Sequence, residues 1–460
     1  MLIAAFEGPF KPRIGRSRRN AGRRRIGGGS HPRIVGDSGG ARGVSQARVA
    51  ASAILYVALL ACGAATGAER PGRHDVLAEF DVPGDGDVLL VPLAVGDRRF
   101  RAEIDTGTNL NYYDASLREL LGPARGSTVV RGALGDVSYE LRDAPRAFVG
   151  ALPVKGDDVA VDPELRERIA DAGHMDVRCI LGMDFLKDYV LRIDFDAGKL
   201  QFLRSAGPDP GLALPMQFDS GQLPVVTVRL GNGRLAAKFI LDTGNEDNGG
   251  ALIDSAIFNR LSKAGDLVPL GTADVRALSI RATARFGQLQ TKFELGPFWH
   301  EGLMVTETKL NALSLSYLSR FTVTIDFPNK VLYLKTGRRF AAPLSDNRSG
   351  MQLKRKGALT VVATVDPETL AADLGIMPGD IVLSVGDLDG ATARLYALEM
   401  TLCEPTVVRV RFERDHRHFE FDLDLHYDLP PGEPDPSVVR GGTSTGEARD
   451  GRAKRCHKRK

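Results

Sequence analysis

The chain has 460 residues, of which 43% are hydrophobic, an ordinary composition for a globular protein but too long for a single hydrophobic core. Its net charge of +3 conceals an uneven distribution, because residues 1–48 carry +9, residues 440–460 carry +6 and residues 49–439 carry −12. An acidic central region argues against a nucleic-acid groove, so we expect no nucleic-acid partner.

The first 74 residues predict a basic arm followed by an export or anchor segment. Residues 1–48 are rich in Arg and Gly and show no apolar period, which indicates disorder. Residues 49–68 contain no charged side chain and end in small residues, a pattern typical of a secretory signal. An uncleaved membrane tether and lipid attachment at Cys62 are alternatives. Each of these three alternatives places the folded part outside the cytoplasm, either free in the periplasm of a bacterium or anchored to the membrane and facing the periplasm.

A three-residue motif occurs twice, each time after a predicted β-hairpin. Residues 88–104 ("VLLVPLAVGDRRFRAEI") read as two strands around a Gly-Asp turn and lead into Asp105-Thr106-Gly107. Residues 223–241 have the same order, with the hairpin signal Asn232-Gly233, and lead into Asp242-Thr243-Gly244. The motif therefore belongs to a longer repeat.

The repeat continues downstream of each triplet. Residues 180–203 match residues 312–334, and each copy contains Ile-Asp-Phe before a second hairpin. Helical periodicity is scarce and is confined to short pieces such as residues 163–172. The sequence predicts a mainly β protein in which residues 75–204 and 205–340 are two copies of one unit, related by a pseudo-twofold axis.

Pseudo-symmetry would bring the two triplet turns together and place Asp105 and Asp242 at one spot. Two adjacent carboxyl groups cannot both ionise easily, so they share a proton and titrate as a pair. One member can take a proton from water while the other protonates a carbonyl oxygen, which is acid–base hydrolysis of an amide. Gly107 and Gly244 permit a close approach of the backbone, and Thr106 and Thr243 can hydrogen-bond across the axis.

These paired triplets and paired hairpins resemble the retropepsin-like aspartic peptidases in their single-chain, two-lobed bacterial form. The resemblance covers about residues 80–340 and includes the apolar-apolar-Gly motif Ile180-Leu181-Gly182. It implies two β-barrel lobes, Asp105 and Asp242 as catalytic residues, and a site supported by Thr106, Gly107, Thr108, Thr243, Gly244 and Asn245. It also implies β-hairpin flaps, at residues 131–141 and 279–290, that close over an extended polypeptide.

The second copy departs from that family pattern at two positions. Asn245 stands where the family has Ser or Thr, and Ser314 stands where Gly is expected. We expect Asn245 to donate to a carboxylate and small Ser314 to fit. Asp194 and Asp326 are a rival repeated pair, which we interpret as structural because each lies in a strand. His416 and His418 form a His-x-His pair, interpreted as a surface pair rather than a metal site, and four scattered cysteines predict no disulfide framework.

A third unit is expected at residues 348–427. The stretch "AADLGIMPGDI" (residues 371–381) closely resembles bacterial PDZ domains. That resemblance implies binding of an extended peptide, commonly a free C-terminus, with the carboxylate loop near Gly350, Met351, Gln352 and Leu353. Residues 428–460 are Pro/Gly-rich and then basic, and predict a disordered tail.

The sequence thus predicts an exported aspartic-type endopeptidase that uses neither a metal nor a cofactor and recruits peptides through a PDZ domain. The alternative is a catalytically inactive adaptor that binds peptides through the PDZ domain and a degenerate protease cleft.

Overall fold

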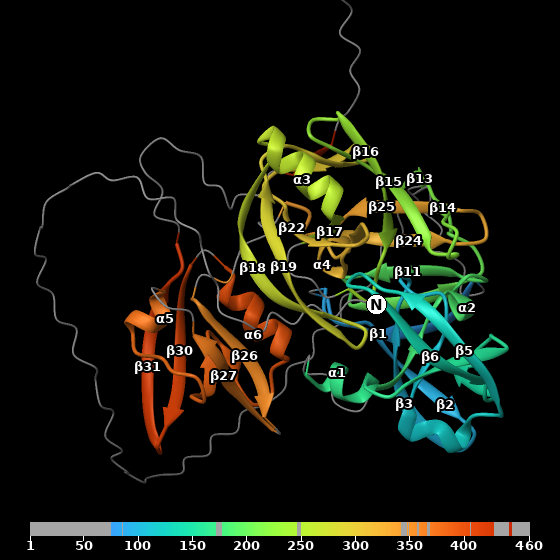
Figure 1. The fold of residues 1–460 in the computed structure, drawn as a ribbon, viewed down its shortest axis with the longest axis horizontal. Helices are drawn as coiled ribbons and strands as arrows, with labels where there is room; N and C mark the ends of the chain where they lie inside the picture. The colour runs from blue at the N-terminus through green and yellow to red at the C-terminus, as the bar shows by residue number, and fades with distance from the viewer. Residues whose placement is uncertain are drawn as a thin grey trace, which may run out of the picture.

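A computed structural model describes residues 75–84, 86–171, 177–245, 250–341, 347, 349–356, 358–365, 369–404, 406–426 and 441–443. The described chain is mainly β, as predicted. Figure 1 shows the strands of residues 75–340 on the right and those of residues 351–424 on the left. The predicted arm, export segment and most of the predicted tail lie outside the described residues.

The first repeat, residues 75–204, supplies the elements up to β12. In chain order these are β1 (Val76–Asp81), β2 (Leu90–Val95), β3 (Arg98–Ile104), β4 (Tyr112–Asp114), the 3-10 helix η1 (Ala115–Leu120), β5 (Ala124–Arg131), β6 (Asp136–Asp143), β7 (Ala147–Val149), β8 (Leu152–Pro153), β9 (Asp158–Asp162), α1 (Leu165–Asp171), β10 (Val177–Leu181), α2 (Met183–Leu186), β11 (Val190–Asp194) and β12 (Lys199–Leu203).

The second repeat, residues 205–340, supplies the elements up to β25. These are β13 (Leu212–Pro215), β14 (Gln217–Phe218), β15 (Pro224–Leu230), β16 (Leu235–Leu241), β17 (Gly250–Asp254), α3 (Ser255–Ala264), β18 (Leu267–Ala277), β19 (Ile280–Leu289), β20 (Phe293–Leu295), β21 (Phe298–His300), β22 (Met304–Thr308), β23 (Ala312–Leu313), α4 (Leu315–Leu318), β24 (Phe321–Asp326) and β25 (Val331–Thr336).

The two repeats have the same strand order. The sheet of the first repeat runs β5-β6-β9-β4-β10-β3-β2-β7-β8, and that of the second runs β18-β19-β22-β17-β23-β16-β15-β20-β21. Local signals repeat as well: Asp114 accepts a hydrogen bond from Ser116 N to cap η1, and Asp254 accepts one from Ile257 N to cap α3. The four hairpins predicted around the triplets and the Ile-Asp-Phe motifs are all present.

A six-stranded sheet joins the repeats. Its order is β1-β12-β11-β24-β25-β13, so each repeat contributes three strands. β11 and β24 pair antiparallel at its centre, with Ile193 opposite Val323. One continuous hydrophobic core then includes buried side chains of both repeats, such as Phe202 and Phe321. The two repeats therefore pack as one body with a shared core rather than as two separate domains.

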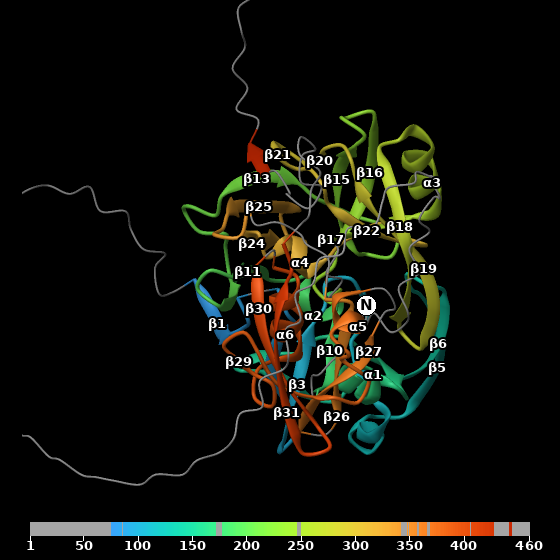
Figure 2. The same ribbon diagram turned by 90° about the vertical axis from the view of Figure 1, so that its left-hand side faces the viewer.

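The prediction of β-barrel lobes is wrong, because the sheets of the described residues are open. The reason is visible at the edge of each sheet. β5 pairs only with β6, and β18 only with β19, so each outer hairpin projects away from its sheet instead of closing it. In Figures 1 and 2, the β18–β19 hairpin extends from the second repeat towards β5, β6 and α1 of the first.

Residues 351–424 form a separate six-stranded sheet with its own hydrophobic core. Its elements are β26 (Met351–Lys356), β27 (Leu359–Val365), α5 (Leu370–Asp373), β28 (Ile381–Val385), β29 (Leu388–Asp389), α6 (Leu395–Leu402), β30 (Val407–Arg414) and β31 (Arg417–Asp424). The order β26-β27-β28-β30-β31 leaves β26 at an edge. Arg394, just before α6, pairs with the buried Asp87 at 2.6 Å and links this unit to the repeats.

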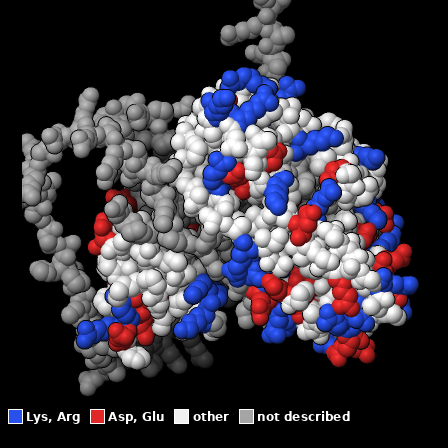
Figure 3. All heavy atoms as spheres, viewed as in Figure 1, with Lys and Arg blue, Asp and Glu red and all other residues white. Residues whose placement is uncertain are grey.

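β32 (Gly441–Thr443) pairs with β21 at the edge of the second repeat's sheet. Acidic and basic side chains are interspersed over the face drawn in Figure 3, as expected for the surface of an ordinary globular protein. No helix of the described residues is long and apolar enough to cross a membrane.

Candidate active site

Each triplet lies where a central strand ends against a parallel neighbour. Asp105 follows β3, and its backbone N–H donates to the carbonyl of Leu181 at the end of β10 (3.0 Å). Asp242 follows β16, and its N–H donates to the carbonyl of Leu313 at the end of β23 (3.1 Å). The two aspartates are thus held by the same contact in two copies of one fold.

A reciprocal hydrogen-bond network joins the triplets. The N–H of Thr106 donates to the hydroxyl of Thr243 (3.0 Å), and the N–H of Thr243 donates to the hydroxyl of Thr106 (3.1 Å). Each hydroxyl then donates across the axis, Thr106 to the carbonyl of Leu241 (2.5 Å) and Thr243 to that of Ile104 (2.8 Å). Both threonines are fully buried, so the four bonds hold the two turns in a fixed relation.

The two carboxyl groups meet between these turns. The side chain of Asp242 is hydrogen-bonded to that of Asp105. Each carboxyl also lies against the opposite glycine: a Cβ on Gly107 would be 2.2 Å from Asp242 Oδ1, and one on Gly244 would be 2.3 Å from Asp105 Cγ. Only glycine fits such an approach. Gly107 N and Gly244 N donate to the carboxylates of their own triplets, at 2.7 and 3.1 Å.

Burial and proximity determine the protonation of this pair. Asp105 is fully buried and Asp242 is 3% exposed. Burial, together with the neighbouring Asp105 carboxyl, raises the pKa of Asp242 from 3.8 to about 7. A pair that retains one proton at near-neutral pH can supply a base and an acid at the same place.

The two sequence departures have local structural accounts. Gly182 leads into α2, and a Cβ there would lie 2.3 Å from the carbonyl oxygen of Leu110. Its counterpart Ser314 instead caps α4, accepting from Tyr317 N at 3.3 Å, and its hydroxyl contacts that of Ser316 at 2.7 Å. The expectation that Ser314 fits the packing is therefore met.

Thr108 and Asn245 occupy equivalent backbone positions. The carbonyl of Thr108 accepts from Met183 N (2.9 Å) and that of Asn245 from Leu315 N (2.8 Å). Both residues are buried, Thr108 at 4% exposure and Asn245 at 0%. The hydroxyl of Thr108 donates to Tyr112 Oη at 3.4 Å. Donation from the Asn245 side chain to a carboxylate of the aspartate pair stays a prediction.

Two long hairpins meet over the triplet strands. They are β5–β6, with its tip at residues 132–135, and β18–β19, with its tip at residues 278–279, so the expected flap segments are the tips and second strands of these hairpins. Leu278 is 2% exposed and packs in the cluster of Tyr112 and Ile180 in the first repeat. Ala133 packs with Ala312 in the second repeat, and its carbonyl accepts from Lys309 N at 2.8 Å. Each tip is inserted into the opposite repeat.

The rival residues lie elsewhere. Asp194 accepts from Ala197 N and Asp326 from Asn329 N, both at 3.0 Å, so each closes the turn of its own hairpin.

His416 and His418 are exposed beside Glu413. Within the described residues no group of three or more His, Cys, Asp and Glu side chains could hold a metal ion. Cys179 and Cys403 are buried and form no disulfide.

Supporting residues also appear that the sequence did not single out. Asn111 accepts from Gly182 N at 3.0 Å and donates to the carbonyl of Lys155 at 2.9 Å, which fixes the turn beside the first triplet. A second asparagine, Asn311, lies directly before β23 in the second repeat, and its side chain accepts from Asp254 N at 2.8 Å. The two asparagines occupy different places in the two sequence copies, so the alignment of the repeats does not reveal them.

The edge strand β26 of the C-terminal unit begins at Met351, directly after Gly350, and includes Gln352 and Leu353. Met351 is fully buried and Leu353 is 5% exposed, and both belong to the core of that unit. Only the backbone and Gln352, which is half-buried, are left to face a ligand. This group lies on a different sheet from the aspartate pair.

The chain matches no protein-family model, and no curated protein matches it. Function is therefore inferred from the residues and their geometry.

Proposed function

We propose that this protein is an exported aspartic-type endopeptidase, built from two retropepsin-like lobes and a C-terminal PDZ domain. One observation carries the proposal: the buried, hydrogen-bonded carboxyl groups of Asp105 and Asp242, held between two copies of the same strand-and-turn by reciprocal threonine bonds. Two repeats in one chain supply both carboxyl groups, so catalysis requires no second subunit.

The chemistry follows from the shared proton. The ionised carboxyl takes a proton from a water molecule as its oxygen bonds to the peptide carbonyl carbon, and the protonated carboxyl gives its proton to the carbonyl oxygen. Collapse of the tetrahedral intermediate breaks the C–N bond, and the leaving nitrogen receives a proton from the pair. No metal and no covalent intermediate take part. The two inserted hairpins separate to admit an extended polypeptide and close over it to exclude water.

The C-terminal unit fits the role of peptide recruitment. β26 is an edge strand with α6 packed against it, an arrangement that an extended peptide can join by adding a strand. The loop at Gly350 would receive the free carboxylate of such a peptide. This recruitment rests on the PDZ resemblance of residues 348–427.

The deciding experiment compares three proteins on an unfolded test substrate such as reduced casein. Wild type is expected to cleave it between pH 4 and 7 with sensitivity to pepstatin, and Asp105→Asn is expected to lose at least about 100-fold in rate because the pair no longer contains a base. Asp194→Asn is the matched control, since that aspartate closes a hairpin turn away from the pair. Activity in Asp105→Asn equal to wild type would refute the proposal.

A second candidate is a catalytically silent peptide-binding protein. The observation that favours it is the closed state of the hairpins together with Asn245 in place of a hydroxyl residue. In that case wild type and Asp105→Asn would bind a peptide library equally well, and neither would cleave it at any pH from 4 to 7.

A further inference from the structure

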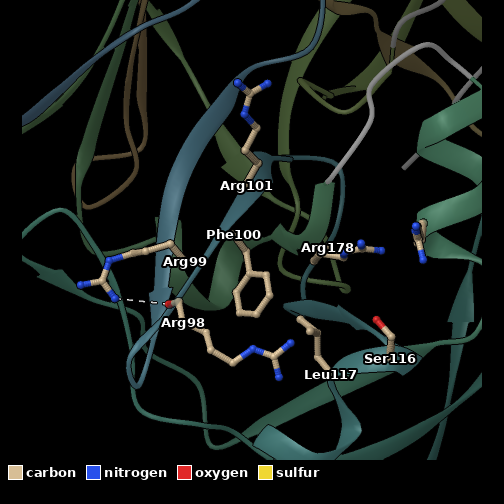
Figure 4. Close-up of a pocket in the computed structure, with 8 residues that line it drawn as sticks. Arg98, Arg99, Phe100, Arg101, Ser116, Leu117 and Arg178 are labelled. Atoms are coloured by element: carbon tan, nitrogen blue, oxygen red, sulfur yellow. Dashed lines mark hydrogen bonds between the residues drawn. The ribbon is translucent and has the colours of Figure 1, made fainter. Parts of the chain in front are cut away.

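An arginine-rich hollow lies on the first repeat, apart from the aspartate pair. It encloses about 690 Å³ and is lined by Arg98, Arg99 and Arg101 of β3, Arg166 of α1 and Arg178 of β10. Phe100, Leu117 and Ser116 complete the lining. Figure 4 shows the ring of Phe100 among the labelled side chains, with Arg98 and Arg178 on two sides of it. A volume of this size suits a small organic molecule.

The guanidinium groups here are only partly used by the protein. Arg98 pairs with Glu119 at 2.7 Å, and Arg99 donates to the backbone carbonyls of Gly96 and Arg98. The side chains of Arg101 and Arg166 are exposed and form no hydrogen bond or ion pair with any residue that the structure describes. The nearby Asp114 carboxylate is occupied by the N–H groups of Ser116 and Arg166. Positive charge therefore exceeds negative charge in the hollow.

The corresponding positions of the second repeat carry none of these arginines. Thr106 and Thr243 are equivalent and 137 positions apart. At the same offset, Arg98, Arg99, Phe100 and Arg101 correspond to Leu235, Ala236, Ala237 and Lys238 of β16. Leu181 and Leu313 are equivalent by register, and three residues before them stand Arg178 and Leu310. The same strand pair is built in the second repeat with a single cation.

We infer that this arginine hollow is a binding site for a small phosphomonoester whose organic part is apolar. Planar guanidinium forks match the oxygens of a phosphate in pairs, and the arginines that line this hollow come from three elements. The partly buried Phe100 and the buried Leu117 offer an apolar floor for the organic part. Bound there, the ligand would bridge β3 and β10, the two strands whose ends hold Asp105 and Leu181. The inference is independent of peptidase activity.

Calorimetric titration of the whole protein with phenyl phosphate and with inorganic phosphate, at fixed ionic strength, tests the site. Wild type is expected to bind phenyl phosphate saturably and more tightly than inorganic phosphate. Arg101→Gln and Arg166→Gln should each weaken binding about tenfold or more, because each removes a charge-assisted contact. Phe100→Ala should remove the preference for phenyl phosphate. Lys238→Gln, the equivalent change in the second repeat, should bind as wild type does.

Three results would overturn the inference. The first is absence of saturable binding by wild type at millimolar phenyl phosphate. The second is equal loss in Lys238→Gln and Arg101→Gln, which would indicate general charge attraction. The third is sedimentation with phosphatidic-acid vesicles, lost in Arg101→Gln, without binding of either soluble probe, which would assign the hollow to a membrane lipid. Melting temperatures without ligand check that each variant is folded.

Discussion

Replacing Thr106 by Val tests whether the threonine network fixes the two repeats to each other. Valine keeps the shape of the side chain and removes the hydroxyl, which makes two of the four bonds between the triplets. The N–H of Thr243 is then left buried without its acceptor, and the carbonyl of Leu241 loses its donor. Each such loss costs about 1–3 kcal/mol, so the two together should lower the free energy of unfolding by roughly 2–6 kcal/mol. That is a large part of the stability of an ordinary domain.

The assay is urea unfolding followed by tryptophan fluorescence. The chain has one Trp, Trp299, which lies in β21 of the second repeat, so the signal reports on the repeats and not on residues 351–424. Thr324→Val is the matched control, because the Thr324 hydroxyl is fully buried in β24 and has no hydrogen-bond partner among the described residues. It should leave stability unchanged or raise it. The reasoning would be refuted if Thr106→Val lowered the free energy of unfolding by less than about 1 kcal/mol while the slope of that free energy against urea concentration stayed unchanged.

Burial and Asp105 raise the pKa of Asp242 to about 7, so the folded protein keeps a proton that the unfolded chain releases near pH 3.8. The contribution of this group to the free energy of unfolding is therefore complete below about pH 4 and is lost as the pH rises to 7. Asp242→Asn should flatten that part of a curve of stability against pH. Arg168→Met should lower the free energy of unfolding, measured in urea, by about 3–5 kcal/mol, because it leaves the fully buried Asp162 carboxylate without its cation. An unchanged free energy of unfolding would contradict this. Leu278→Ser should speed hydrogen exchange at residues 132–135 by loosening the inserted tips, whereas the exposed Leu359→Ser should not.

The features predicted well from sequence are local or repeated. Alternating apolar residues and Asn232-Gly233 located the hairpin before the second triplet, because strand and turn signals act over a few residues. The repeat then predicted that two equivalent turns lie together, and the network of Thr106 and Thr243 is the contact that pseudo-symmetry requires. Asp194 and Asp326, which repeat as the triplets do, each accept a hydrogen bond that closes the turn of their own hairpin.

The features that sequence reasoning missed depend on contacts distant along the chain. The open sheets arise because the outer hairpins insert their tips, at Ala133 and Leu278, into the opposite repeat. No local pattern encodes that choice, since an exposed hairpin and an inserted one have similar sequences. The arginine hollow likewise draws on β3, α1 and β10, which meet only after folding. Asn111 acts through Gly182, which is 71 residues away.

The joining of both repeats within one polypeptide has a consequence for how such a molecule can change. In an assembly of two identical chains, every mutation appears on both sides of the axis, so an alteration that helps one side is imposed on the other. Here the two sides have separate codons. Ser314 can cap a helix where Gly182 avoids a carbonyl, and β3 can carry three arginines where β16 carries one lysine. The shared sheet keeps the halves in register while their surfaces diverge.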